Sequence, residues 1–268
     1  MLDGVLEGLD SGRTVQLIGE PGIGKTRLVT EVLERSRDLG YVALAGRGAE
    51  FEREVPFSVF ADALEDHLAS LDMTSLDGLD AERLGELAVV FPSISSQVDD
   101  GVEELQLERY RFHRAVRALL EELAGHRPLV LALDDLHWAD TASVELVRHL
   151  LRHQPEAPVL FLLALRHRQA PQELRAALDS AAREGTSDRI ELAALERTEA
   201  EELLGEALDR PTREMLCRAS GGNPFYLKQL ARAAQRGTDA PASGRESQET
   251  DVPQAVTASI IDEIAVLS

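Results

Sequence analysis

The sequence is poor in cysteine and has no long apolar run. A single cysteine, Cys217, leaves no partner for an internal disulfide, which fits a reducing cytoplasm. The longest apolar run, residues 158–165, is far shorter than the roughly 20 residues that a membrane helix needs. The first residues are acidic and have no basic segment, so we expect neither a secretory signal nor a membrane partner.

Positive charge is also scarce, because 28 Lys and Arg stand against 48 Asp and Glu, for a net charge of −20. This balance disfavours bulk attraction to nucleic acid or to anionic lipid. Residues 62–108 hold 13 acidic residues and only one basic residue, Arg83. Such a stretch is usually a solvated helical surface, and a docking face for a basic partner is the alternative.

Short apolar segments alternate with segments of helical periodicity along most of the chain. This alternation predicts an α/β fold with a mostly parallel sheet, followed by an all-helical lid. Strands are expected near residues 15–18, 41–45, 129–133, 159–165 and 189–193, and helices near 25–38, 57–70, 80–90, 103–124, 141–153 and 171–183. The expected domains are an α/β domain over 1–196 with an acidic helical insertion at about 57–124, a helical lid over 197–235, a flexible linker over 236–252 and a last helix within 253–268.

One segment matches the phosphate-binding pattern G-x-x-x-x-G-K-[ST] between an expected strand and an expected helix. Small residues let the backbone curl so that its N–H groups point at a phosphate chain, and the helix N-terminus adds partial positive charge. Lys25 would reach the β- and γ-phosphates, and Thr26 would offer its hydroxyl to Mg²⁺. The nucleotide-binding residues expected from this pattern are Gly19, Glu20, Pro21, Gly22, Ile23, Gly24, Lys25 and Thr26.

A second motif places two adjacent carboxylates at the tip of an apolar strand, in residues 129–140 (Leu-Val-Leu-Ala-Leu-Asp-Asp-Leu-His-Trp-Ala-Asp). Two acids there are costly unless a positive group faces them, and in P-loop NTPases that group is hydrated Mg²⁺. We expect Asp134 on the metal side and Asp135 to orient or deprotonate the attacking water. An ordinary turn is the alternative, and the phosphate-binding pattern weighs against it.

Three further polar positions have both a functional and a structural explanation. Arg166 ends the fourth expected strand, and because strand ends in a parallel sheet open onto the ligand crevice, we expect it to sense the γ-phosphate; a surface arginine is the alternative. Asp140 fits the N-cap of the next helix. His149 and His153 stand four residues apart on one helix and could hold a metal, but with no third ligand evident a structural role is favoured.

Three segments together resemble the signalling (STAND) P-loop ATPases, in particular the ATPase domains of large LuxR-type and MalT-like bacterial transcription regulators. They are residues 19–28 (Gly-Glu-Pro-Gly-Ile-Gly-Lys-Thr-Arg-Leu), 134–140 (Asp-Asp-Leu-His-Trp-Ala-Asp) and 221–227 (Gly-Gly-Asn-Pro-Phe-Tyr-Leu). The resemblance extends over about residues 10–267. It implies a P-loop NTPase sheet of five parallel strands in the order 5-1-4-3-2, flanked by helices, with a C-terminal helical lid.

The resemblance also implies a function and a set of site residues. ATP or ADP would bind with Mg²⁺ in a site that includes Arg27, with Pro224 of the lid near the adenine. Asp134 and Asp135 would serve magnesium and hydrolysis, and Arg166 would be the sensor arginine. Hydrolysis in this family is slow and acts as a switch, with ATP favouring self-association and ADP a closed state.

The two ends of the chain depart from the family pattern. The Gly-Arg-Glu segment expected well before the phosphate loop is missing, and residues 252–268 resemble the first helix of a winged-helix domain, with Glu263 where the family often has Arg. We therefore expect truncated ends, an effector domain and protein partner outside this sequence, and no specific nucleic-acid binding by this chain.

Three other functions are compatible with parts of the sequence. A mechanical AAA+ ATPase acting on nucleic acid, such as an origin-binding loader, would need an arginine finger, for which Arg183 is the candidate, and the net charge weighs against it. A P-loop kinase would need lid arginines around an acceptor pocket. A scaffold with a vestigial phosphate loop is disfavoured by the intact Lys25 and Thr26.

Overall fold

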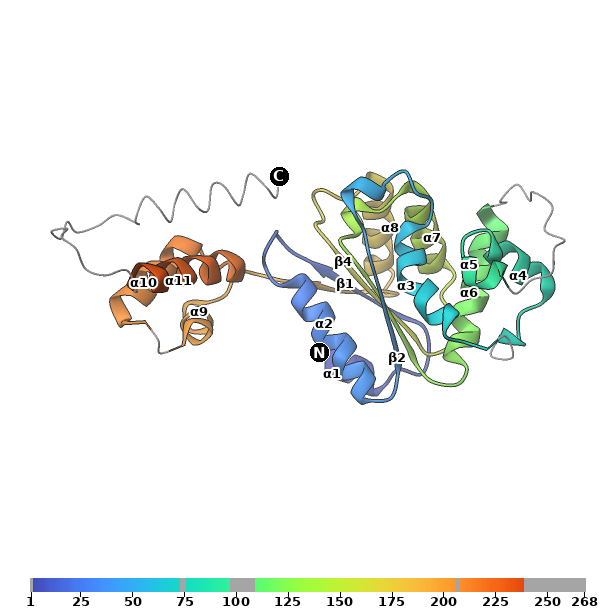
Figure 1. Cartoon of the computed structure of the whole chain (residues 1–268), viewed down its shortest axis with the longest axis horizontal. Coiled ribbons are helices and arrows are strands. Elements are labelled where there is room, and N and C mark those ends of the chain that lie inside the picture. Colours follow the sequence, from blue (N-terminus) through green and yellow to red (C-terminus); the bar gives the residue numbers. More distant parts are fainter. Residues whose placement is uncertain (1, 73–75, 97–108, 206–207, 239–268) are drawn as a thin grey trace. The chain divides into compact units, whose positions relative to one another are not determined.

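The computed structural model describes residues 2–72, 76–96, 109–205 and 208–238, and its elements alternate as the sequence predicts (Figure 1). The strands are β1 (Arg13–Ile18), β2 (Val42–Arg47), β3 (Leu129–Asp134), β4 (Val159–Leu165) and β5 (Asp188–Glu191). The helices are α1 (Leu2–Glu7), α2 (Lys25–Asp38), α3 (Ser58–Ala69), α4 (Ala81–Ala88), α5 (Pro92–Ser95), α6 (Arg109–Ala124), α7 (Thr141–Arg152), α8 (Gln172–Arg183), α9 (Arg197–Leu204), α10 (Arg210–Ser220) and α11 (Pro224–Thr238). Short 3-10 helices include η1 (Glu50–Glu52) and η3 (Leu136–Trp138).

The five strands form one sheet in the order β2-β3-β4-β1-β5, and all four pairings are parallel. This confirms the predicted order 5-1-4-3-2. Arg47 at the end of β2 lies opposite Asp134 of β3, and Ile18 at the end of β1 lies opposite Leu165 of β4. The carboxyl ends of the strands therefore meet at one edge of the sheet, which is where parallel α/β sheets bind ligands.

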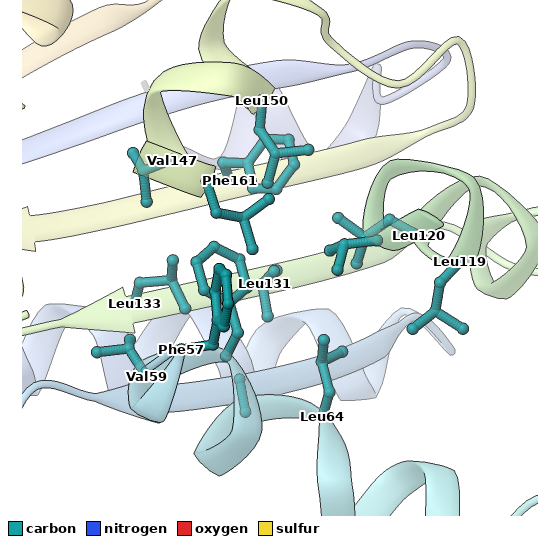
Figure 2. Packing of buried hydrophobic residues seen from close by; sticks show 14 of the residues in the cluster. Phe57, Val59, Leu64, Leu119, Leu120, Leu131, Leu133, Val147, Leu150 and Phe161 are labelled. Atoms are coloured by element: carbon teal, nitrogen blue, oxygen red, sulfur yellow. The ribbon is translucent and has the colours of Figure 1, made fainter. Parts of the chain in front are cut away.

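Helices cover both faces of the sheet. Successive residues of each strand point to opposite faces, so both sets of side chains are buried. In β3, Leu131 and Leu133 pack with α3, α6 and α7, whereas Ala132 packs with α1 and α2 on the other face. Figure 2 shows the first of these clusters, in which Phe57 and Phe161 lie beside the side chains of β3. Every residue of β3 and β4 is buried, which explains their nearly continuous apolar sequences.

Asp140 has a larger structural role than the predicted cap. Its carboxylate accepts hydrogen bonds from the Ser143 backbone N–H (2.9 Å) at the start of α7, as predicted, and also from the backbone N–H groups of Phe57 (3.0 Å) and Ser58 (3.2 Å). Phe57 has a φ of 60°, which is unfavourable for a bulky residue. Asp140 therefore stabilises a strained entry into α3 as well as the start of α7.

The chain forms two compact units. The first comprises the residues up to Gly19 and Lys25–Leu192, and the second comprises Glu20–Gly24 and the chain from Ala193. This differs from the expected boundary at 196, which placed the whole phosphate loop in the α/β domain. The reason is a set of backbone and side-chain hydrogen bonds between Pro21, Gly22 and the start of α11.

The C-terminal expectations lie mostly outside the described residues. The linker was expected from residue 236, but α11 continues to Thr238. The expected last helix within 253–268, including Glu263, is not described, and neither is the expected helix start at 103, since the described part of α6 begins at Arg109. Within the described part of the chain, no helix combines the length and hydrophobicity needed to cross a membrane.

Candidate functional site

The phosphate loop joins the end of β1 to the start of α2. Gly22 and Gly24 have φ values of 71° and 108°, which is the left-handed region that glycine adopts at little cost. A Cβ atom on Gly22 would lie 2.7 Å from the Cβ of Phe225, so this glycine is required for packing as well. The loop therefore has the curled backbone that the phosphate-binding pattern predicts.

The structure brings the phosphate loop and the paired carboxylates together. The Thr26 hydroxyl donates a 2.7 Å hydrogen bond to Oδ2 of Asp134, and the other oxygen of Asp134 accepts from the backbone N–H of Asp135 (2.8 Å). Lys25 is buried, and its Nζ donates to the carbonyl oxygen of Gly19 at 2.8 Å. Both motifs thus meet at the carboxyl edge of the sheet.

The Thr26 and Asp134 oxygens fit a magnesium ion. A hydroxyl and a carboxylate are hard oxygen ligands, and Mg²⁺ usually keeps several waters and takes one or two protein carboxylates besides substrate phosphates. The described residues contain no cluster of three or more His, Cys, Asp or Glu side chains able to hold a metal ion on their own. Thr26 and Asp134 could therefore hold such an ion only together with water and nucleotide oxygens.

Asp135 is held by an arginine that the sequence analysis missed. Asp135 has a φ of 50°, and its Oδ2 accepts hydrogen bonds from Nη2 (2.6 Å) and Nε (2.9 Å) of Arg47. The hydrogen bond to Asp135 raises the pKa of Arg47 above its ordinary value. Arg47 ends β2, so its position at the carboxyl edge of a strand, the same signal that identified Arg166, could have found it.

A buried histidine lies beside this pair. His137 is only 1% exposed, and its Nδ1 lies 3.9 Å from Oδ1 of Asp135. Burial lowers the pKa of His137 to about 4, with further lowering from the charges of Arg166, Lys25 and Arg53 and opposition from Asp135. The imidazole is therefore neutral at pH 7. Sequence reasoning noted this histidine only as part of a motif.

Arg166 follows β4 at the same edge of the sheet. Its Nη1 donates to Oε1 of Gln169 at 3.2 Å, and its Nε is buried without a hydrogen-bond partner among the described residues. Its positive charge contributes to the lowered pKa of His137. That it senses the γ-phosphate stays a prediction.

The tip of the phosphate loop is held by the turn that precedes α11. Nδ2 of Asn223 donates to the carbonyl oxygen of Pro21 at 2.9 Å, while its Oδ1 accepts from the backbone N–H of Phe225 at 3.0 Å. The same N–H of Phe225 also lies 3.3 Å from the carbonyl oxygen of Gly22. Pro224 is the first residue of α11; its role near the adenine stays a prediction.

The expected contacts of the remaining loop residues with nucleotide also stay predictions. Glu20 and Arg27 are exposed, and Arg27 lies in the first turn of α2. Ile23 is partly buried.

The histidines of α7 are joined by a third from α6. The ring centroids of His149 and His153 are 4.7 Å apart, and those of His113 and His149 are 5.4 Å apart. Burial, followed by the charges of His113 and His153, lowers the pKa of His149 to about 4. These ring contacts join α6 to the end of α7, and the described residues include no group of three or more His, Cys, Asp or Glu side chains that could hold a metal ion.

Comparisons with known proteins agree with this geometry. The profile of the AAA ATPase domain family matches residues 1–163. An uncharacterized protein of Rhizobium meliloti is 28% identical over 243 residues, which cover 85% of this chain and 23% of that protein. The peroxide stress-activated histidine kinase mak2 of Schizosaccharomyces pombe is 25% identical over 258 residues, which cover 81% of this chain and 11% of that protein. This chain thus spans less than a quarter of the length of either relative.

A solved structure shows the same fold. The ORC1 protein of Aeropyrum pernix, determined in complex with DNA, superimposes with a TM-score of 0.56 at 14% identity, covering 97% of this chain and 64% of that chain. The family match covers more than half of this sequence and contains the phosphate loop, Asp134 and Asp135. The chain therefore belongs to the AAA ATPase domain family.

Proposed function

We propose that this chain is the nucleotide switch of a signal-transduction or transcription-regulatory ATPase, which binds Mg-ATP and hydrolyses it slowly. The observation that carries the proposal is the 2.7 Å contact between Thr26 and Asp134, because it joins the phosphate loop to the acidic strand end. The resemblance to signalling ATPases supports the regulatory role. By its name, one curated relative is a stress-activated histidine kinase, which supports a signalling context.

Nucleotide binding depends on groups that the fold already holds in place. The curled loop would direct backbone N–H groups at the phosphates, and Lys25 would exchange the carbonyl oxygen of Gly19 for phosphate oxygens. Thr26 and Asp134 would hold Mg²⁺. Magnesium, when bound, neutralises charge that develops on the phosphates.

Hydrolysis depends on the availability of Asp135. Its carboxylate would orient the attacking water and accept its proton. Because Arg47 binds Oδ2 through two nitrogen atoms, the acid must exchange this partner for water. This competition supports slow turnover.

Two groups would report the nucleotide state. Arg166 would distinguish ATP from ADP, because only ATP carries the γ-phosphate. Asn223 links the tip of the phosphate loop to α11, so that a conformational change of the loop would move the start of α11. We propose that self-association follows the nucleotide and that the effector and protein partner belong to other domains.

A nucleic-acid motor is a weaker proposal. It would need Arg183, in the last turn of α8, as an arginine finger for a neighbouring subunit. The net charge of −20 weighs against binding to nucleic-acid phosphates. We therefore expect no specific DNA binding by this chain.

The test uses the only two lysines of the sequence as a matched pair. We expect Lys25→Ala to lower ATP affinity about a hundredfold in calorimetry, since it removes a cation from the phosphates. Lys228→Ala removes the exposed lysine of α11 and should leave affinity unchanged. Turnover and light scattering in ATP and in ADP then measure hydrolysis and self-association. Unchanged ATP affinity in Lys25→Ala would contradict the proposed site.

A further inference from the structure

His137 is a buried polar side chain whose hydrogen-bonding capacity is unused. It is 1% exposed, and neither Nδ1 nor Nε2 has a hydrogen-bond partner among the described residues. Burying an unsatisfied polar group costs about 1–3 kcal/mol, and the great majority of such groups in folded proteins are paired. An apolar side chain of similar size would avoid this cost. The presence of a histidine at this buried position therefore needs another explanation.

The explanation lies in the position of Asp135. Its Oδ2 is bound by Arg47, whereas its Oδ1 faces Nδ1 of His137 at 3.9 Å. A nitrogen–oxygen hydrogen bond is about 2.7–3.2 Å long, so a carboxylate movement of about 1 Å would form one. Catalytic hydrogen bonds are often long in the absence of substrate and shorten in the reactive complex.

His137 has contacts at both its backbone and its ring. Nη2 of Arg53 donates to the carbonyl oxygen of His137 at 3.3 Å, and the Arg53 guanidinium lies over the ring of Trp138 at 4.4 Å. The rings of His137 and Trp138 have centroids 5.2 Å apart. A neutral imidazole carries one ring N–H, and in the Nδ1–H tautomer that group would face Asp135.

We propose that His137 is a positioning residue for ATP hydrolysis, which donates its Nδ1–H to Oδ1 of Asp135 once Arg47 releases the carboxylate. The hydrogen bond would hold Asp135 toward the attacking water. The inference rests on the proposed hydrolysis through Asp135 and adds a second partner for that acid. Arg47 and His137 would then hold the two alternative positions of one carboxylate.

The test compares three substitutions at this position in the full chain. His137→Phe keeps an aromatic ring without hydrogen-bonding groups, and His137→Leu serves the same purpose if the larger ring does not fit. His137→Asn places an amide N–H close to the position of Nδ1, whereas His137→Gln places one near Nε2. We expect Phe and Leu to lower kcat about tenfold with KM and Mg-ATP affinity unchanged, since one hydrogen bond to a charged group is lost. Asn should restore most of the activity and Gln should not.

Two further measurements separate positioning from a purely structural role. Thermal unfolding of His137→Leu should occur at the wild-type temperature or higher, because an unsatisfied buried polar group is removed. In an Asp135→Asn background, His137→Phe should cause no additional loss of kcat, since both act through the same carboxylate. The inference would be overturned if His137→Phe lowered kcat in the Asp135→Asn background as much as it does in the wild type. It would also be overturned if kcat were unchanged in the single His137 variants.

The outcomes distinguish this inference from the proposed function. If wild-type protein hydrolyses ATP and Asp135→Asn slows it strongly, while His137→Phe keeps the wild-type kcat, the ATPase assignment stands and the role of His137 is wrong. If Asp135→Asn does not slow hydrolysis, the proposed water-activating role of Asp135 fails, and the inference fails with it.

Discussion

Thr26 and Asp134 are 108 residues apart in the sequence, yet the hydroxyl of the first lies 2.7 Å from a carboxylate oxygen of the second. Asp134 is 5% exposed, and its other oxygen accepts the backbone N–H of Asp135. The side chains of Asp134 and Asp135 therefore have different partners, because Oδ2 of Asp135 is bound by Arg47. Adjacent acids in such different surroundings should perform different tasks.

The first prediction separates these tasks. Asp135→Asn should leave Mg-ATP affinity nearly unchanged and slow turnover at least about a hundredfold, because a proton acceptor is lost. Asp134→Asn should weaken the dependence of ATP binding on Mg²⁺, because the amide is a poorer ligand for the ion. Calorimetry with and without Mg²⁺, together with phosphate release, measures both. Identical behaviour of the two variants would contradict the division.

The second prediction concerns the ion pair between Arg47 and Asp135. The side chain of Arg47 is 65% exposed, and exposed pairs contribute up to about 1 kcal/mol, which corresponds to about fivefold in rate. We expect Arg47→Ala to raise kcat by up to about fivefold, since Oδ2 is freed. Arg109→Ala, which breaks the exposed ion pair with Glu145, is the control and should not change kcat. A slower Arg47→Ala enzyme would mean that Arg47 assists hydrolysis.

The third prediction concerns Arg166. Its side chain follows β4 at the edge where the phosphates are expected, and its buried Nε has no hydrogen-bond partner within the described part of the chain. Arg166→Ala should weaken ATP binding about tenfold and ADP binding little, because a charged hydrogen bond to the γ-phosphate is worth about 1.5 kcal/mol or more. Titrations with both nucleotides measure the ratio. Equal losses would indicate a structural role.

The fourth prediction uses two substitutions of Asn223. Asn223→Asp keeps the oxygen that accepts from Phe225 but removes the N–H group that holds Pro21. Nucleotide affinity should fall about fivefold, because a carboxylate oxygen repels the Pro21 carbonyl oxygen and leaves the loop tip less well preorganised. Asn223→Ala also removes the hydrogen bond at the start of α11 and should cost about a further 1 kcal/mol of stability. Wild-type affinity in Asn223→Asp would show that this contact does not shape the loop.

The fifth prediction concerns the stability of the contact between α6 and α7 in acid. The pKa of His149 is about 4 in the folded chain and about 6.5 in an unfolded one. As the pH falls, the unfolded chain takes up the proton first, so the stability from neutral His149 is complete above pH 6.5 and is lost as the pH falls toward 4. The loss is at most about 1.4 kcal/mol per pH unit.

Thermal unfolding between pH 7 and pH 4.5 tests this expectation. His149→Phe should reduce the pH dependence, because the titrating group is removed while the ring contact with Tyr110 (centroids 6.1 Å apart) is kept. If His149→Phe shows the same slope as the wild type, the acid sensitivity comes from other groups.

Much of the fold could be predicted because it depends on local patterns. Strand β4 was predicted with its observed bounds, and α2 likewise, since apolar runs and helical periodicity are properties of neighbouring residues. The phosphate-loop pattern and the adjacent acids predicted Thr26 and Asp134 as ligands of one magnesium ion. The two side chains lie 2.7 Å apart, because the parallel topology brings strand ends to one edge, and their binding of the ion stays a prediction.

The sequence by itself predicted the alternation of strands and helices, the glycine-rich phosphate loop and the two acids at the end of β3, and the resemblance to signalling ATPases supplied the order of the strands. The tertiary structure alone decided that Arg47 binds Asp135, that His137 lies buried beside the same carboxylate and that Asn223 holds the tip of the phosphate loop. The first and third contacts join residues that are distant in sequence. The second joins residues two positions apart, where the backbone of Asp135 has a positive φ. No local periodicity encodes them, because they arise only when strands and helices pack in three dimensions.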